Sequence, residues 1–347
     1  MVDIREIKAH GRAIRPHKAV VGPILGERTV LTNSPWTFVA LWLKRKHANR
    51  ALFYWQQARE FHKVAQGLPP QSAPLLLYYS FLNATKALLT AKGLPFNEHH
   101  GVRESSASAR TTSLAALGVG IKQTGVLPAL SAYYGEAEPV RTHTLQEMFY
   151  NMVFIHRTYC LTYTTQAEMF IPLARCRYIA QRSTKRVYFR ADITENVPIA
   201  TAVRRLPSLF VSDPSFGERA VRSVDFVVYR KPSTPSKREL AEIAELNRSL
   251  RRELQFINGT EALWYIRSRV NGPSRLQRQL PTLILGAMHR LSEICRYKPL
   301  QLASLLDGQK NWLVNEFIEM SAAQFIDEIA SEITGLQFLV PNVRAAN

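Results

Sequence analysis

Two adjacent histidines and two polar residues of a strongly apolar segment are the first candidates for chemistry. His99 and His100 follow the segment 72–92, in which Asn83 and Lys86 are polar exceptions. Neighbouring imidazoles near a helix end could act as acid and base groups or as ligands. Asn83 and Lys86 are three residues apart and would share one helix face. We therefore interpret these four residues as the candidate catalytic group.

The same residues also have a structural interpretation. His100 could hydrogen-bond backbone carbonyl groups in a tight turn, and the Lys86 side chain could extend outward to water. A buried lysine needs a partner, because an unpaired buried charge is strongly destabilising. Glu60 or Glu98 could supply that partner. We expect a structural ion pair ahead of a binding pocket at Lys86.

Metal, cofactor and thiol chemistry find little support in the motifs. The three cysteines, Cys160, Cys176 and Cys295, form no CxxC pair, so we expect reduced thiols and neither a zinc site nor a disulfide framework. The sequence has no phosphate-binding loop, dinucleotide-binding glycine pattern, metalloprotease motif or kinase signature. Gly118 and Gly120 lack a third glycine and a preceding strand, and we interpret them as a turn. The sequence predicts no metal and no cofactor.

The charge of the chain is strongly positive and unevenly distributed. Its 347 residues carry 45 Lys and Arg against 27 Asp and Glu, a net charge of +18 with a pI of about 10.1. Residues 1–50 hold ten basic against three acidic side chains, residues 173–231 hold twelve against five, and residues 307–347 hold two against six. Such a surplus is typical of proteins that meet nucleic acid, a membrane surface or an acidic protein, and it also occurs as a solubilising surface.

Ten basic residues fall into clusters that could contact phosphates. Some would lie on helix faces, and others lie beside a predicted hairpin in which Tyr188 and Phe189 separate the cations. Basic residues interleaved with aromatic ones can bind phosphates while the rings stack on bases. The candidate nucleic-acid-binding residues are Lys44, Arg45, Lys46, Arg50, Lys185, Arg186, Arg190, Arg248, Arg251 and Arg252.

The elements that must position these residues are mainly helical. Ser34 followed by Pro35 predicts a helix start, and the segment 72–92 predicts a central buried helix. Ser236 with Glu239 predicts a capping box for a helix over 236–257. Alternating β-branched and aromatic residues predict strands at 177–193 and 221–229.

We therefore expect an α+β fold class: mainly a helical bundle with an internal β-rich segment. The expected divisions are an irregular N-terminal segment at 1–33, a helical region at 34–165, a β-rich region at 166–235, and a helical C-terminal region at 236–347 that packs with the first helices. No apolar run approaches the roughly 18 residues that a membrane span needs, and the N-terminus does not resemble a signal peptide. We expect a cytoplasmic protein without a membrane partner.

Two blocks of the chain, at 34–101 and 281–320, carry a distinctive set of residues in a fixed order. These are Trp36, Asn49-Arg50-Ala51, Phe53-Tyr54, Gln57-Ala58, Pro74-Leu75-Leu76, Tyr78-Tyr79-Ser80-Phe81-Leu82-Asn83, Lys86-Ala87-Leu88-Leu89, His100-Gly101, Leu285-Gly286, Arg296-Tyr297-Lys298-Pro299 and Glu316-Phe317. With these residues the chain resembles the YaaC-like family of bacterial proteins. The resemblance implies a cytosolic protein. The family has no established reaction, so no catalytic residue carries over.

The helical N-terminal half also resembles, more weakly, HEPN-type helical domains. Ribonucleases of that type use an Arg and a His four to six residues apart near a helix start. Such spacings occur here only at Arg5 with His10 and at Arg12 with His17, in a segment that we expect to be non-helical.

The function expected from these patterns is that of a cytosolic nucleic-acid-associated binding or accessory protein, in a setting such as phage defence or a mobile element. RNA and DNA are both open as partners. Two alternatives stay open as well. One is an HEPN-like ribonuclease, and the other is a non-enzymatic subunit whose basic face and acidic C-terminal end meet a protein partner or a second copy of the chain.

Overall fold

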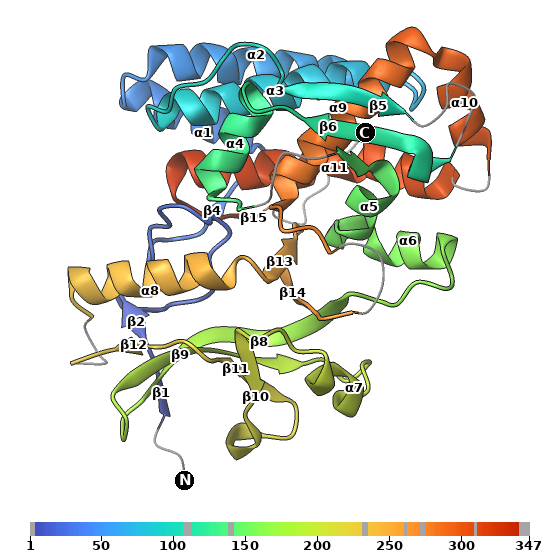
Figure 1. The fold of residues 1–347 in the computed structure, drawn as a ribbon. Helices are drawn as coiled ribbons and strands as arrows, with labels where there is room; N and C mark the ends of the chain where they lie inside the picture. The colour runs from blue at the N-terminus through green and yellow to red at the C-terminus, as the bar shows by residue number, and fades with distance from the viewer. Residues whose placement is uncertain are drawn as a thin grey trace. The chain divides into compact units, whose positions relative to one another are not determined.

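Two compact units make up the chain in the computed structural model (Figure 1). Unit 1 consists of Met1–Thr32, Glu168–Asn271 and Gly335–Asn347, and unit 2 consists of Asn33–Ala167 and Gly272–Thr334. Each unit is therefore assembled from segments that are far apart in the sequence. The structure describes residues 4–106, 113–137, 142–230, 235–259, 262–270, 275–308 and 311–339.

Unit 2 is mainly helical. Its central helix α3 (Ala73–Ala91) is buried on nearly all sides, as its apolar composition predicts, and packs against four other helices. The Phe81 ring of α3 stacks on Phe325, with ring centroids 4.4 Å apart. The other α-helices of unit 2 are α1 (Pro35–Arg45), α2 (Asn49–Ala65), α4 (Val126–Tyr134), α5 (Leu145–Tyr150), α6 (His156–Thr162), α9 (Leu280–Tyr297), α10 (Pro299–Asp307) and α11 (Asn311–Thr334).

Helix boundaries in unit 2 follow local signals. Helix α1 begins after Ser34 with Pro35 in its first turn, as predicted. Helices α1 and α2 are separated just after the basic run, where His47 adopts a left-handed φ of +54°. A 3₁₀ turn at Val153–Ile155 separates helix α5 from helix α6. No helix in the described part of the chain has the length and apolar character needed to cross a membrane.

Unit 2 also contains a three-stranded antiparallel sheet that the sequence pattern did not indicate. Its strands are β5 (Val102–Ser106), β6 (Leu117–Ile121) and β7 (Thr142–Thr144), with β6 in the middle. The prediction of a turn at Gly118 and Gly120 is wrong, because both lie in the buried strand β6. A Cβ atom on Gly118 would lie 2.3 Å from the carbonyl oxygen of Ser105. Glycine is therefore needed there for close strand approach.

Unit 1 is built on an eight-stranded sheet in which every pairing is antiparallel. The strand order is β10-β11-β9-β8-β14-β13, with β1 added beside β8 and β12 beside β9. The strands are β1 (Ile4–Glu6), β8 (Phe170–Gln181), β9 (Arg186–Ile193), β10 (Phe210–Ser212), β11 (Ala220–Ser223), β12 (Val227–Val228), β13 (Leu254–Ile257) and β14 (Leu263–Arg267).

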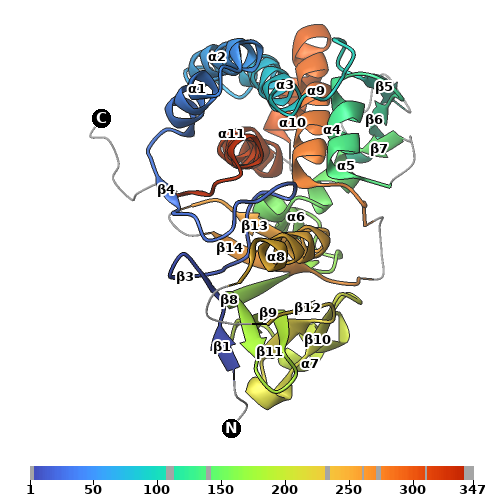
Figure 2. The ribbon, with the colours of Figure 1, turned by 90° about the vertical axis from the view of Figure 1, so that its left-hand side faces the viewer.

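One face of this sheet is covered by helix α8 (Lys237–Leu250), as Figures 1 and 2 show. The predicted capping box is present: the Ser236 hydroxyl accepts from the Glu239 amide, and the Glu239 carboxylate accepts from the Ser236 amide. Ile243 and Leu250 of α8 join the hydrophobic core that also contains Phe189 of β9. A short helix, α7 (Ile199–Arg204), follows β9.

Two small strand pairs complete unit 1. Strand β2 (Lys8–Ala9) pairs with β3 (Arg12–Ala13), and β4 (Val30–Leu31) pairs in parallel with β15 (Phe338–Leu339). The second pair ties the last described residues of the chain to its N-terminal segment. The segment expected to be irregular at 1–33 therefore contributes four short strands.

The fold class is α+β, and the prediction that it is mainly a helical bundle is wrong. The described residues form eleven α-helices and fifteen strands, and eight of the strands build one curled antiparallel sheet. This sheet is not an internal segment, because β1 comes from the N-terminus and β13 and β14 from the region expected to be helical. Strands of two to five residues carry too little alternation to be recognised in isolation.

The C-terminal region also differs from the expected division of the chain. The helix predicted over 236–257 ends at Leu250. The last four residues of the predicted segment, 254–257, form strand β13 instead. Helix α8 belongs to unit 1 and packs on the sheet, whereas α9, α10 and α11 belong to unit 2. Residues 340–347 lie outside the described residues.

Candidate nucleic-acid interface

The sheet of unit 1 has a second face, opposite α8, which we call the outer face. Along β9, Val187, Phe189 and Ala191 belong to the core, so Arg186, Tyr188 and Arg190 point the other way. Residues directly opposite each other on paired strands share a face. We include in the outer face the cross-strand partners of these residues, together with Arg175, which pairs with Asp192, and Phe226, whose ring contacts Tyr188. The outer face then comprises Glu6, Arg175, Arg177, Ile179, Arg186, Tyr188, Arg190, Asp192, Val211, Arg222, Phe226 and Val228.

Three arginines form a row across the middle of the outer face. Arg177 of β8 lies directly opposite Arg190 of β9, and Arg190 lies directly opposite Arg222 of β11. Like charges in directly opposed cross-strand positions repel each other and destabilise a sheet. This arginine row is therefore an arrangement that needs nearby negative charge, either from the protein or from a ligand.

Carboxylates of the protein meet part of that need. Arg177 Nη1 lies 3.4 Å from a Glu6 carboxylate oxygen, and Arg190 Nη2 lies 3.4 Å from an oxygen of Asp192. Arg222 pairs in the same way with Asp213 at 3.3 Å. Asp192 is shared, because Arg175 Nε also lies 2.6 Å from it. The row and Arg175 thus place four guanidinium groups against three carboxylates.

The row retains unused hydrogen-bonding capacity. Among the described residues, the Nε atoms of Arg177 and Arg190 have no hydrogen-bond partner although both are buried. Burial lowers the pKa of the Arg190 guanidinium, and the positive charges of Arg177 and Arg175 lower it further, against the opposing effect of Asp192. An additional anion at this place would relieve the mutual repulsion.

Aromatic rings flank the arginine row. The guanidinium of Arg186 lies 4.0 Å from the ring centroid of Phe226, and that of Arg222 lies 4.6 Å from the Tyr188 ring. The two rings are themselves 5.7 Å apart. Phe226 is 40% exposed, which is unusual for a phenylalanine. Three valines are also exposed: Val211 on β10, Val224 just after β11 and Val228 on β12.

A bulge in β8 shapes one end of the outer face. The register of β8 against β9 shifts between Ala174 and Arg177, and Arg175 adopts a φ of +54°. This left-handed conformation is costly for a residue with a Cβ atom. The bulge lets Arg175 reach the carboxylate of Asp192 while Cys176 remains in the core.

Three of the predicted basic residues lie at or beside the outer face. Arg186 and Arg190 belong to it, and the exposed Lys185 ends the hairpin turn that leads into β9. Lys185 adopts a φ of +54°, as tight hairpin turns often require.

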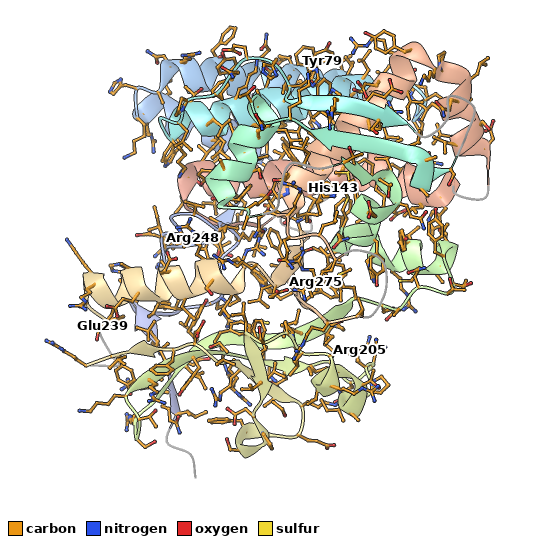
Figure 3. The ribbon with its side chains drawn as sticks, viewed as in Figure 1. Tyr79, His143, Arg205, Glu239, Arg248 and Arg275 are labelled. Atoms are coloured by element: carbon orange, nitrogen blue, oxygen red, sulfur yellow. The ribbon has the colours of Figure 1, made fainter. Side chains whose placement is uncertain are left out.

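The predicted cluster on α8 lies on the opposite side of the sheet. Arg248, labelled in Figure 3, pairs with Glu245 at 3.7 Å, and Arg252 is exposed. Arg251 is only 2% exposed, donates to the carbonyl oxygen of Leu254 and stacks on aromatic rings of the sheet. Its guanidinium therefore holds the end of α8 against the sheet.

The remaining predicted basic residues belong to unit 2. Lys44, Arg45 and Lys46 end helix α1 and are exposed, and the Lys46 amine lies 5.8 Å from the Trp42 ring. Arg50, in the first turn of α2, pairs with Glu98 at 3.3 Å. The ten predicted residues are therefore divided between the two units.

The four candidate catalytic residues contact separate partners. Asn83 donates to the carbonyl oxygen of Tyr79 within its own helix, and Lys86 forms an ion pair with Glu98 at 2.6 Å. These contacts match the structural interpretation of the two side chains. The ring nitrogen of His99 lies 3.3 Å from the hydroxyl oxygen of Thr124, and no described contact joins it to Asn83 or Lys86.

His100 instead meets a histidine that the sequence did not single out. Its ring lies 4.4 Å from the ring of His289 on α9, and His100 Nδ1 accepts from the Val102 amide. Burial and the positive charge of neighbouring groups lower the pKa of His289 to about 3. His289 is therefore neutral at physiological pH, with its Nδ1 3.6 Å from the carboxylate of Glu293.

The positive charges of Arg290, Arg296 and Lys122 act on His289, and Arg290 also belongs to a charged cluster of unit 2. Arg290 lies 2.9 Å and Lys298 2.8 Å from the same oxygen of Glu104. The hydrogen bond from Lys298 is the main cause that lowers the pKa of Glu104 to about 2. The described residues contain no group of three or more His, Cys, Asp or Glu side chains that could hold a metal ion.

The comparison with protein families gives one match. A family model described as YaaC-like Protein covers residues 31–333. The chain belongs to the YaaC-like family. The match includes the outer-face residues of β8, β9 and β11, so the arginine row lies within the family region of this YaaC-like protein. No curated protein and no solved structure matches the chain.

Several residues of the interface were not found from the sequence. Arg177, Arg222 and Phe226 were not singled out, although arginines recur at alternate positions of the strand segments. The available signal was this alternation, which places arginines on one face of each strand. Which arginines become neighbours depends on the register between strands, and the sequence does not determine that register locally.

Proposed function

We propose that this YaaC-like protein binds single-stranded nucleic acid on the outer face of its sheet, as a cytoplasmic binding or accessory protein. The observation that carries the proposal is the arginine row beside the exposed Phe226 ring. Guanidinium groups bind phosphates, and an exposed ring offers a surface on which a base can stack. Phage defence or a mobile element would be a fitting setting for such a protein.

The distribution of charge supports unit 1 as the binding unit. Unit 1 carries 26 Lys and Arg against 14 Asp and Glu, whereas the longer unit 2 carries 19 against 13. Binding to the phosphate backbone depends on the number of cations that replace counterions. The greater positive excess of unit 1 therefore favours it as the electrostatic partner.

The aromatic component favours a single strand over a duplex. Bases in a duplex are stacked on each other and cannot place a face against a protein ring. Phe226 would stack on a base without sequence preference, while the partly exposed Arg177 and Arg222 contact the backbone. Tyr188 and Arg190 are each only 6% exposed and do not contact the strand directly. RNA and DNA are both compatible with this mode, and direct comparison of the two strands decides between them.

Fluorescence anisotropy with a labelled strand of about 15 nucleotides tests the proposal, since this is within the range of common single-strand site sizes. We expect tighter binding of the single strand than of the matching duplex. Replacement of Phe226 by alanine should weaken binding at least about fivefold, because stacking contributes roughly 1–3 kcal/mol per base. Phe53→Ala is the matched control, since Phe53 is 59% exposed but belongs to unit 2.

Two outcomes would contradict the proposal. One is the absence of strand binding at low salt, where phosphate-driven binding is strongest. The other is equal weakening by Phe226→Ala and Phe53→Ala, which would mean that exposed rings anywhere on the surface contribute alike.

A ribonuclease is a second candidate, favoured by the contact between the rings of His100 and His289. A neutral imidazole can act as a general base toward a ribose hydroxyl group, and nearby arginines can stabilise phosphate charge. In this proposal His100 is the accessible member, because His289 is only 3% exposed. RNA cleavage by the purified chain that is abolished in His100→Asn and retained in His99→Asn would support it.

An assembly through the acidic C-terminal end has less support. Asp327, Glu328 and Glu332 of helix α11 are each at most 3% exposed, and Glu332 accepts a hydrogen bond from Tyr133. Three of the six acidic side chains of residues 307–347 are therefore buried inside unit 2, where a protein partner could not reach them.

A further inference from the structure

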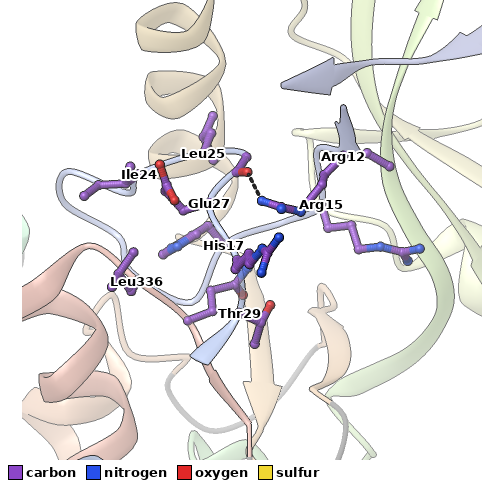
Figure 4. Close-up of a pocket in the computed structure, with 12 residues that line it drawn as sticks. Arg12, Arg15, His17, Ile24, Leu25, Glu27, Thr29 and Leu336 are labelled. Atoms are coloured by element: carbon purple, nitrogen blue, oxygen red, sulfur yellow. Dashed lines mark hydrogen bonds between the residues drawn. The ribbon is translucent and has the colours of Figure 1, made fainter. Parts of the chain in front are cut away.

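A cavity of about 360 Å³ in unit 1 has a strongly basic lining (Figure 4). We call it the cationic cavity. It is lined by the N-terminal segment and by the residues just before β15. Its lining includes Arg12, Arg15, His17, Arg28, Thr29 and Gln337.

Positive charge in the cationic cavity is largely uncompensated. Three arginines line it, against the single carboxylate of Glu27. Within the described parts of the chain, neither Arg15 nor Arg28 has a carboxylate partner, and Arg12 donates only to the carbonyl oxygen of Gly26 at 3.4 Å, the dashed line in Figure 4. Three guanidinium groups of this kind suit a ligand that carries a phosphate.

The imidazole of His17 lines the same cavity and is held in place by a hydrogen bond. His17 is 3% exposed, and its Nδ1 accepts from the Ala19 amide at 3.0 Å. Burial and the positive charge of Arg251 lower its pKa to about 3. His17 therefore adds no charge to the site near neutral pH.

A second cavity, of about 730 Å³, adjoins the cationic cavity. The two share Arg15, Thr29 and Gln337. Most of the second lining is apolar, although Arg175, Thr194 and Lys18 also face it. Its apolar wall consists of Leu173, Leu263, Trp264 and Leu339. A cationic end that opens into an apolar chamber matches a ligand with a phosphate at one end and an apolar ring system at the other.

Residues 24–29 form a loop that lines the cationic cavity and is held in place by backbone hydrogen bonds. The Ile24 amide donates to Gly335 at 2.9 Å, and the Val30 amide donates to Gln337 at 2.8 Å. Gly26 has a φ of +81°, and a Cβ atom there would lie 2.4 Å from the Cβ of Ala9. The close approach and the positive φ both require glycine. A loop fixed in this way loses little entropy when a ligand binds.

We propose that the two adjoining cavities form one binding site for a nucleoside phosphate. The phosphate lies between Arg15 and Arg28, the nucleoside lies against the apolar wall with Trp264, and Thr29 and Gln337 hydrogen-bond its polar edges. A free nucleotide and the 5′-phosphorylated end of a strand carry this same chemistry. The site includes none of Arg177, Arg190 and Arg222, so it does not rest on strand binding by the arginine row, although Arg175 of the outer face also lines its second cavity.

Isothermal titration calorimetry on the full chain tests the proposal with AMP, adenosine and inorganic phosphate. We expect AMP to bind, and adenosine and phosphate each to bind at least about tenfold more weakly, because each fills only one end of the site. The double variant Arg15→Gln with Arg28→Gln should weaken AMP binding at least about tenfold, as expected for lost charge-assisted hydrogen bonds. A second arm compares strands with a 5′-phosphate and a 5′-hydroxyl group, which distinguishes a strand end from a free nucleotide.

The matched control is Lys237→Gln with Arg238→Gln, which removes the same charge from the exposed start of α8. Circular dichroism checks that each variant is folded, and the single variant Arg28→Gln replaces the double one if the latter is not. The proposal is overturned if neither AMP nor the 5′-phosphorylated strand gains over its phosphate-free counterpart. It is also overturned if the cavity variant and the control lose the same affinity. Strand binding that fails while AMP binds would overturn only the proposed function of the outer face.

Discussion

Neutralising part of the outer face should change the salt dependence of strand binding in a calculable way. The variant replaces Arg177 and Arg186 by glutamine. Arg186 has no described carboxylate partner, and Arg177 pairs with the half-exposed Glu6 at 3.4 Å, a surface pair worth about 1 kcal/mol or less. The fold should therefore tolerate both substitutions, and the effect should fall on binding.

The magnitude follows from the number of phosphate contacts. For a single strand, the logarithm of the binding constant falls with the logarithm of salt concentration with a slope of about −0.7 per contact. The outer face offers at most four solvent-reachable arginines, namely Arg175, Arg177, Arg186 and Arg222, because Arg190 is only 6% exposed. Four contacts give a slope of about −2.8, so a fourfold rise in salt should weaken binding by about 50-fold. The variant has two contacts, a slope of about −1.4, and a loss of about 7-fold.

Anisotropy titrations at four or more salt concentrations measure these slopes. The control variant, Lys237→Gln with Arg238→Gln, removes two charges from the opposite side of the sheet and should leave the slope unchanged. An unchanged slope in the outer-face variant would refute the reasoning. Equal changes in both variants would also refute it, because binding would then follow net charge rather than the arginine row.

Two further predictions concern stability. The pKa values of His17 in unit 1 and His289 in unit 2 are both lowered to about 3, so the contribution of these two histidines to stability should be constant above about pH 6.5. Below that pH the free energy of unfolding should fall by about 1.4 kcal/mol per pH unit for each histidine. Urea unfolding between pH 7 and pH 5 measures this fall, and a flat profile would contradict it. Gly118→Ala should lower the melting temperature, because overpacking costs about 1–3 kcal/mol of stability. Gly67→Ala is the control, since its added Cβ would have an ordinary contact at 4.0 Å, and equal melting temperatures of the two variants would contradict the reasoning.

The helices of unit 2 were largely predictable because their signals are local. Ser34 and Pro35 mark the start of α1, and the apolar composition of 72–92 marks the buried helix α3. Ser236 and Glu239 likewise mark the start of α8. The end of α8 was not predictable from the sequence. Apolar residues continue at helical spacing to Leu254 and Ile257, but these two residues lie in β13 and pair with β14. Competition from a sheet edge overrides helical periodicity there.

The candidate sites were predictable only in part. Arg186, Arg190 and the aromatic residue between them were recognised from their interleaving, and His100 from its position after α3. Their partners were not recognised, because Arg222 is 32 residues from Arg190 and His289 is 189 residues from His100. Sequence spacing carries no information about side chains that approach from such distances.

The sequence by itself determined the basic charge of the chain, the starts of its main helices and the alternation of arginines within strand segments. These properties depend on composition or on interactions within a few residues. Only the tertiary structure decided that Arg177, Arg190 and Arg222 lie in one row, that the rings of His100 and His289 are in contact, and that residues 12–29 meet residues 336–337 around a cavity. Strand register and helix packing are set by burial of the whole core, so contacts between distant segments arise only when that core forms.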